Sequence, residues 1–202
     1  MTGIGSGRTL VAGVGNIFLR DDAFGVEVVR LLTERPRPPG VEIRDFGIRG
    51  VHLAYDLLNG CDLFVLIDAA ARGDEPGTVT VLEVDPPDAD PGAAPLIDAH
   101  GLTPDDVFLL LASLGGRPAR SLVVTCEPAD VSAGMGLSEP VQAALPHAVR
   151  AVEDILARAT AHQANERLSA MRTVIEAKGG GAGDGDQADQ GSFGGGRARA
   201  GD

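Results

Sequence analysis

The sequence predicts an α/β protein, a three-layer α/β/α sandwich with a mostly parallel central sheet and one antiparallel edge strand. Short runs rich in Val, Leu and Ile alternate along the chain with segments in which apolar residues recur every three or four positions. Residues 63–67 are apolar throughout, which is typical of a parallel strand buried on both faces. Residues 78–84 alternate with a period of two, which favours a strand at the sheet edge.

The predicted elements follow one another in a regular order. Strands are expected at residues 8–12, 41–46, 63–67, 78–84 and 121–126, and helices at residues 21–34, 51–58, 103–114 and from 138 onward. The third helix has the clearest start, because Thr103 can cap its first turn and Pro104 suits the first helical position. Glycines at positions 13 and 15 indicate a turn after the first strand.

One domain accounts for most of the chain. We expect residues 1–162 to form the α/β domain and residues 163–178 to extend its last helix. Residues 179–202 contain ten glycines and no aliphatic side chain larger than alanine. Such a segment buries too little apolar surface to offset the entropy of ordering it, so the sequence predicts a disordered tail.

Charge and composition exclude several classes of function. The 202 residues carry 17 basic and 29 acidic side chains, a formal net charge of −12, which disfavours binding to nucleic acid or to anionic lipid. No apolar run approaches the roughly 20 residues that a membrane span needs, and the N-terminus has no signal-peptide pattern. Two distant cysteines cannot form a disulfide framework. We therefore expect a cytoplasmic protein.

Acidic side chains gather at the predicted functional edge of the sheet. Ligands of open α/β sheets bind outside the carboxyl ends of the strands. The residues expected there are Asp21 and Asp22 after the first strand, Asp45 after the second, Asp68 after the third, and His100 in a later loop. Converging carboxylates repel one another unless a cation or protons offset their charge. Oxygen and nitrogen donors without thiolate suit zinc, nickel, manganese or a similar divalent ion.

Other interpretations of these residues stay open. Each aspartate alone could be a cap or turn residue. Gly13 and Gly15 match the opening of a dinucleotide-binding motif, but Phe18 stands where its third glycine belongs, and the carboxylates that follow would repel a pyrophosphate. Cys126 could act as a nucleophile paired with His100, although free cysteines are more often buried apolar residues.

Several of these motifs together resemble one known family, the nickel-iron hydrogenase maturation endopeptidases. The resemblance covers roughly residues 8–158 and rests on Gly13-Val14-Gly15-Asn16, Asp21-Asp22-Ala23-Phe24-Gly25-Val26, Asp68, His100 and Cys126-Glu127-Pro128. It implies a cytoplasmic protease that removes a short C-terminal extension from the hydrogenase large-subunit precursor after nickel has been inserted. It also implies a monomer whose partner is that precursor.

The resemblance also assigns roles to individual residues. Its metal-binding positions fall on Asp22, Asp68 and His100, and the metal is nickel already held by the substrate's cysteines; another divalent ion is an alternative in vitro. Asp45 would contribute to positioning or to proton transfer. Two positions depart from the family pattern: Asp22 replaces a Glu of well-known members, and residues 45–50 read Asp-Phe-Gly-Ile-Arg-Gly instead of Asp-Gly-Gly-Thr-Xaa-Gly.

Besides the cysteine hydrolase with Cys126 and His100, three functions remain in competition. The first is the endopeptidase, in which the metal either polarises the scissile carbonyl and activates a water or serves only for docking while Asp45 acts as general base. The second is a non-catalytic, nickel-dependent checkpoint or chaperone that binds the precursor without cutting it. The third is a Rossmann-type nucleotide binder.

Overall fold

The computed structural model of the protein describes residues 7–85, 104–118 and 120–179. In chain order, its elements are β1 (Thr9–Val14), the 3-10 helix η1 (Arg20–Ala23), α1 (Phe24–Thr33), β2 (Val41–Gly47), α2 (Gly50–Leu57), β3 (Leu63–Ala69), β4 (Val79–Val84), α3 (Pro104–Ser113), β5 (Ser121–Cys126) and α4 (Glu139–Gly179). The chain divides into two units, Met1–Gln163 and Ala164–Asp202. All of these elements except the end of α4 belong to the first unit.

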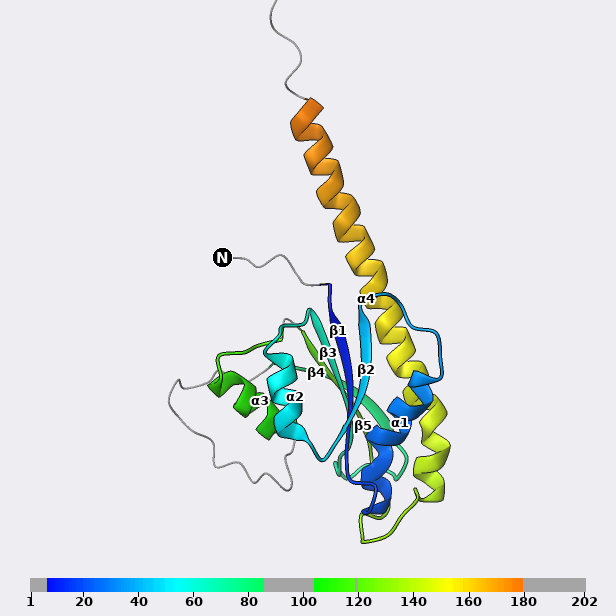
Figure 1. Ribbon diagram of the computed structural model, residues 1–202. Helices are drawn as coiled ribbons and strands as arrows, with labels where there is room; N and C mark the ends of the chain where they lie inside the picture. The colour runs from blue at the N-terminus through cyan, green and yellow to red at the C-terminus, as the bar shows by residue number, and fades with distance from the viewer. Residues whose placement is uncertain (1–6, 86–103, 119, 180–202) are drawn as a thin grey trace, which may run out of the picture. The chain divides into compact units, whose positions relative to one another are not determined.

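A five-stranded sheet forms the middle layer of the first unit, with the strand order β2-β1-β3-β5-β4 (Figure 1). β1 pairs in parallel with β2 and β3, and β3 pairs in parallel with β5. β4 runs antiparallel to β5 at one edge. The predicted fold class is thereby confirmed, and the segment with period-two alternation is the antiparallel edge strand.

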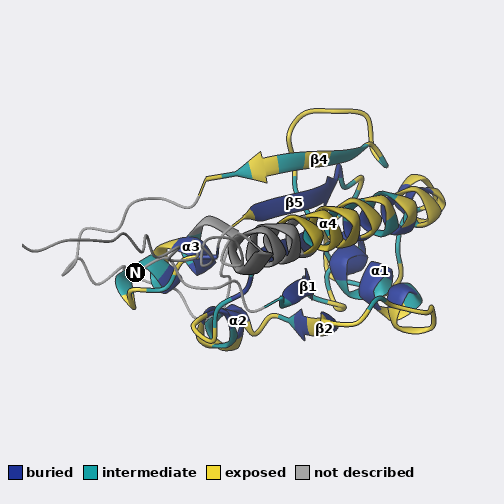
Figure 2. Cartoon of the chain, turned by 90° about the horizontal axis from the view of Figure 1, so that it is seen from above, coloured by how far each residue is buried: buried dark blue, intermediate teal, exposed yellow. Residues whose placement is uncertain are grey.

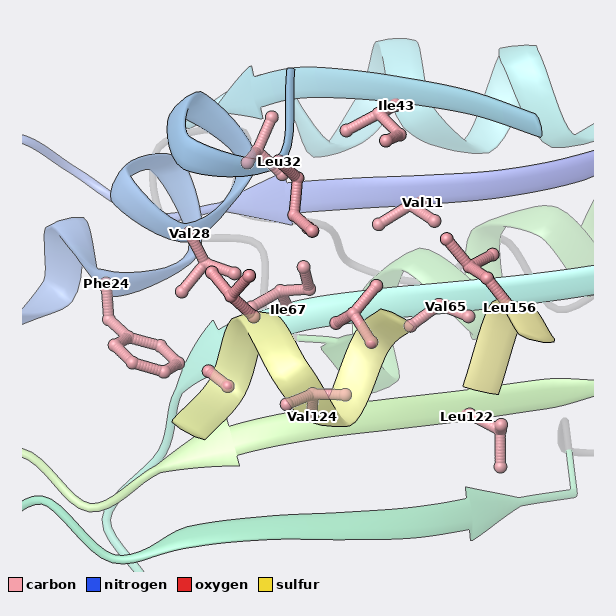
Figure 3. Packing of buried hydrophobic residues seen from close by; sticks show 14 of the residues in the cluster. Val11, Phe24, Val28, Leu32, Ile43, Val65, Ile67, Leu122, Val124 and Leu156 are labelled. Atoms are coloured by element: carbon pink, nitrogen blue, oxygen red, sulfur yellow. The ribbon is translucent and has the colours of Figure 1, made fainter. Parts of the chain in front are cut away.

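Helices cover both faces of this sheet and enclose two apolar cores. α1 and the first part of α4 pack on one face, where Val11, Val65 and Ile67 contribute from the strands (Figure 3). α2 and α3 pack on the other face, against residues that include Leu10 and Phe64. β5 is buried along its whole length, whereas β4 keeps exposed positions at the edge (Figure 2). The two cores take alternate residues of the strands, because successive side chains of a strand point to opposite faces of the sheet.

The first helix begins later than the sequence pattern predicts. The expected helix covers residues 21–34, but the chain forms η1 first and α1 starts at Phe24. No side chain caps η1 or α1. The carboxylate of Asp21 is used elsewhere, because it accepts hydrogen bonds from the loop between β5 and α4. A tertiary contact has thus replaced the local cap that the sequence suggests.

The last helix is long. α4 begins one residue after Ser138 and continues to Gly179. The tail expected at residues 179–202 lies, apart from Gly179, outside the described residues. Within the part of the chain that the structure describes, no helix combines the length and hydropathy that crossing a membrane requires.

The topology places a switch point at the carboxyl ends of β1 and β3. The chain passes from β1 to β2 on one side and returns to β3 on the other side of β1. Connections that leave neighbouring strands in opposite directions open a gap where ligands bind in this class of fold. The start of α1 lies close to these strand ends, because a Cβ on Gly25 would clash with the carbonyl oxygens of Val14 and Ile67.

Gly25 provides a test of this close approach. We expect Gly25→Ala to lower the free energy of unfolding by about 3 kcal/mol, because the added methyl group has to push backbone atoms apart. The control is Thr33→Ala at the exposed end of the same helix, which should change it by less than about 0.5 kcal/mol. Chemical denaturation measures both. Equal stability of Gly25→Ala and wild type would contradict the packing described here.

Candidate functional site

Asp22 and Asp68 lie in η1 and at the end of β3, beside the switch point between β1 and β3. Asp22 lies in η1, where its Oδ2 accepts a hydrogen bond of 2.6 Å from the backbone N–H of Asn16. Asp68 is the next-to-last residue of β3 and is opposite Thr125 of β5. Only 9% of Asp68 is exposed. Asp22 is close enough for its charge to act on Asp68, which has little access to water.

The electrostatics of this pair are unfavourable for two negative charges. Burial, and to a smaller extent the charge of Asp22, raise the pKa of Asp68 to about 7, although the hydrogen bond from the N–H of Ala69 acts in the opposite direction. Asp68 is consequently about half protonated at neutral pH. A divalent cation between the two carboxylates would remove their repulsion and displace the remaining proton.

The third predicted donor, His100, lies outside the described residues. Within the described ranges, no group of three or more His, Cys, Asp and Glu side chains could hold a metal ion. A metal ion bound to Asp22 and Asp68 would therefore need further ligands from outside the described residues or from a bound molecule. An ion held in this way keeps coordination positions open to a substrate.

Asp45 occupies a different position from this pair. It lies within β2, opposite Gly13, and β1 separates its strand from β3. The register shifts at this point, because Gly13 is opposite Asp45 but Val14 is opposite Gly47. The extra residue forms a β-bulge that lets Phe46 enter the core beside α2 while Asp45 stays exposed. No described contact joins Asp45 to the carboxylate pair.

Arg49 supports the bulge. Its Nε donates to the carbonyl oxygen of Phe46 at 3.0 Å, and its Nη2 donates to the carbonyl oxygen of Asp45 at 2.8 Å. The side chain thus satisfies two carbonyls at the carboxyl end of the edge strand β2. This role explains a basic residue at position 49, where the family pattern leaves the residue type open.

Asp21, the neighbour of Asp22, ties two distant loops together. Asp21 is fully buried and its Oδ2 accepts hydrogen bonds from the backbone N–H groups of Ala129 (2.8 Å) and Asp130 (2.9 Å). The N–H and hydroxyl groups of Ser138 donate to Oδ1 and Oδ2 at 2.6 and 2.8 Å. Burial would raise the pKa of Asp21, but these hydrogen bonds outweigh it and lower the pKa. Asp21 is therefore a structural anchor.

Comparison with known proteins identifies the family. The family model HycI, a hydrogenase maturation protease, matches residues 26–155. The chain belongs to the hydrogenase maturation protease family. The hydrogenase expression/formation protein HupM of Azotobacter chroococcum mcd 1 is 36% identical over 151 residues, which cover 74% of this chain and 71% of that protein. The hydrogenase 2 maturation protease of Escherichia coli (strain K12) is 33% identical over 148 residues, which cover 72% of this chain and 88% of that protein.

Solved structures show the same relationship for the fold. The hydrogenase maturating endopeptidase HybD from E. coli aligns with a TM-score of 0.60 at 30% sequence identity, covering 75% of this chain and 93% of that chain. A hydrogenase 2 maturation peptidase from Thaumarchaeota archaeon SCGC_AB-539-E09 aligns with a TM-score of 0.59 at 30% identity, covering 74% of this chain and 98% of that chain. The resemblance seen in the motifs is confirmed, and this hydrogenase maturation protease is a peptidase by family.

The Cys126-Glu127-Pro128 motif of the protease has a structural role that sequence reasoning missed. The buried carboxylate of Glu127 accepts hydrogen bonds from the N–H groups of Arg72 (2.6 Å) and Gly73 (3.3 Å), and these lower its pKa despite burial. It thereby anchors the loop between β3 and β4. The signal was an acidic residue directly after a buried strand, which could equally have indicated a ligand.

Cys126 itself is unsuited to nucleophilic catalysis. Its side chain is fully buried, and burial together with the charges of Asp21 and Glu127 raises the pKa of the thiol to about 11. The thiolate is the reactive form of cysteine, and very little of it exists at neutral pH when the pKa is so high. The alternative of a cysteine hydrolase that uses Cys126 therefore has no support from the structure.

Asp68→Asn tests the charge pair through stability. The raised pKa of Asp68 means that the folded protein holds a proton that the unfolded chain releases near pH 4, so wild type loses stability as the pH rises from about 4 to 7. We expect Asp68→Asn to match wild type near pH 4 and to exceed it at pH 8 by up to about 4 kcal/mol. Asp154→Asn, at an exposed position of α4, is the control. A constant difference across this pH range would contradict the charge pair.

Asp21→Asn tests the anchor between the loops. An amide cannot accept all four hydrogen bonds, because one of its two polar atoms is itself a donor. We expect a loss of about 3 kcal/mol in the free energy of unfolding, measured by chemical denaturation at pH 7. Ser138→Ala removes only the hydroxyl donor and should cost about 1 kcal/mol. If the two variants were equally stable, the buried carboxylate would not be the centre of the anchor.

Proposed function

We propose that this protein cleaves a C-terminal extension from the large-subunit precursor of a nickel-iron hydrogenase, after nickel has been inserted into that precursor. The observation that carries the proposal is the Asp22–Asp68 carboxylate pair beside the switch point between β1 and β3, in a chain of the hydrogenase maturation protease family. A pair of this kind attracts a divalent cation. Nickel held by the precursor is the cation that the proposal assigns to it, and the protease acts as a cytoplasmic monomer.

Recognition of nickel follows from the electrostatics of the pair. Asp22 and Asp68 supply two oxygen ligands and His100 a nitrogen ligand, while the precursor's own cysteines keep their bonds to the ion. A precursor without nickel leaves the carboxylates unneutralised, so they contribute no favourable binding free energy. The loaded precursor relieves the repulsion that raises the pKa of Asp68, so its binding is favoured by the protease's own charge distribution. Another divalent ion can occupy the pair in vitro.

Two routes for hydrolysis follow from the position of Asp45. In the first, the ion polarises the scissile carbonyl and activates the attacking water, and Asp45 only positions the substrate. In the second, the ion docks the substrate and Asp45 takes a proton from the water as general base. The exposed position of Asp45 on β2 makes it accessible to a bound peptide. Asp45→Asn distinguishes the routes, because it should abolish turnover only in the second.

Mass spectrometry of the precursor tests the proposal directly. We expect purified wild-type protein to convert nickel-loaded precursor to a shorter product and to leave nickel-free precursor intact. Asp68→Asn and His100→Ala should reduce the rate at least about 100-fold, because each removes a ligand of the docking ion. Asp154→Asn serves as the matched control and should cleave at the wild-type rate, since its carboxylate is exposed on α4.

The same experiment separates the protease from the two alternatives. A non-catalytic checkpoint protein would bind the loaded precursor but leave its mass unchanged. A nucleotide binder would ignore the precursor and gain thermal stability from a dinucleotide. Cleavage retained by both Asp68→Asn and His100→Ala would refute the assignment of these residues to the metal, even though the protein would still be a peptidase.

A further inference from the structure

Four large apolar side chains are exposed on two loops at the carboxyl edge of the sheet. Ile17 and Phe18, between β1 and η1, are 42% and 62% exposed, and Val131 and Met135, between β5 and α4, are 51% and 70% exposed. We call these four residues the apolar loop patch. Single exposed apolar residues are common on proteins, but four of them on two paired loops near the Asp22–Asp68 pair need an explanation.

The two loops that carry the patch are fixed to each other. Leu19 and Gly134 form an isolated β-bridge, and the N–H of Gly134 donates to the carbonyl oxygen of Phe18 at 2.8 Å. The N–H of Arg20 donates in turn to the carbonyl oxygen of Gly134 at 3.1 Å. The buried carboxylate of Asp21 also holds the two loops together, because it accepts hydrogen bonds from the N–H groups of Ala129 and Asp130. In Figure 1 the loop between β5 and α4 passes below the start of α1, where the other loop ends.

The patch is also continuous with the carboxylate pair. The N–H of Phe18 donates to Oδ1 of Asn16 at 3.0 Å, and the N–H of Asn16 donates to Oδ2 of Asp22 at 2.6 Å. One short turn therefore holds both an exposed aromatic ring and a proposed metal ligand. Phe18 is thus only two hydrogen bonds away from Asp22, and a protein that brings a cation to Asp22 comes close to this turn.

From this continuity we infer that the apolar loop patch is the docking surface for apolar side chains of the hydrogenase precursor, next to its metal-bearing segment. The inference rests on the proposed function and adds the part of the surface that holds the substrate. Substrates of this family are proteins, so an interface of protein size is required around the cleavage site. Because hydrogen bonds already order the loops, binding loses little conformational entropy there, and aromatic and methionine side chains suit such contacts.

Steady-state kinetics with nickel-loaded precursor tests the inference. We expect Phe18→Ser and Met135→Ser each to raise KM about tenfold, which corresponds to about 1.4 kcal/mol, with kcat close to that of wild type. Tyr55→Ser is the matched control, because Tyr55 is 56% exposed on α2 and is not part of the patch. Its neighbour Asp56 pairs with Arg8, which precedes β1, whereas the patch follows β1. It should leave both constants unchanged. Thermal unfolding confirms that all three variants are folded.

Hydrogen exchange gives a second measurement that does not depend on cleavage. Nickel-loaded precursor should protect backbone amides of residues 17–20 and 131–135 in the wild-type protein, and protection should weaken in Phe18→Ser. If KM and protection are unchanged in both variants, the inference is overturned. It is also overturned if sedimentation shows a wild-type dimer that Phe18→Ser dissociates without a change in KM, because a second copy would then cover the patch.

Failure of the proposed function can be told apart from failure of the docking surface. If wild-type protein leaves the loaded precursor whole, cleavage is refuted, and protection of the two loops then decides the docking surface by itself. Protection without a product supports docking, and absence of protection overturns it.

Discussion

The site depends on one electrostatic constraint, the repulsion between Asp22 and Asp68. Burial and the charge of Asp22 together raise the pKa of Asp68 to about 7, so the empty pair lowers the stability of the protein at neutral pH. The fold keeps this pair together because α1 begins close to the ends of β1 and β3, which a glycine at position 25 permits. This unneutralised charge is the basis of the proposal that the protease distinguishes a partner that carries a cation from one that does not.

Around this pair, other buried carboxylates have purely structural roles. Asp21 and Glu127 are both buried, but each accepts several hydrogen bonds from backbone N–H groups, and the pKa of each is lowered. Asp68 differs because only one backbone hydrogen bond opposes its burial. For three acidic residues of similar burial, the number of donors that face each one therefore decides whether its pKa is lowered or raised.

The anchoring residues connect stability to recognition. Asp21 fastens the loop before α4 to η1, and this fastening places Phe18 and Met135 on paired segments next to Asp22. The β-bulge supported by Arg49 similarly leaves Asp45 exposed at the same edge of the sheet. Rigid elements thus hold a carboxylate pair, an exposed carboxylate and an apolar surface at the same edge of the sheet, the arrangement on which the proposed recognition of a loaded precursor rests.

The sequence by itself determined the fold class, the order of the elements and the family, because hydrophobic periodicity and the spacing of motifs are local properties of the chain. It also indicated that acidic residues gather at one edge, since parallel strands end there. Only the tertiary structure decided that Asp21 is an anchor and Asp22 part of a charge pair, although the two are adjacent in the chain. The start of α1 and the bulge in β2 were likewise set by contacts between distant segments. The physical reason is that a carboxylate's role depends on the donors and charges around it. The decisive ones, Ala129 for Asp21 and Asp22 for Asp68, lie more than 40 positions away in the chain.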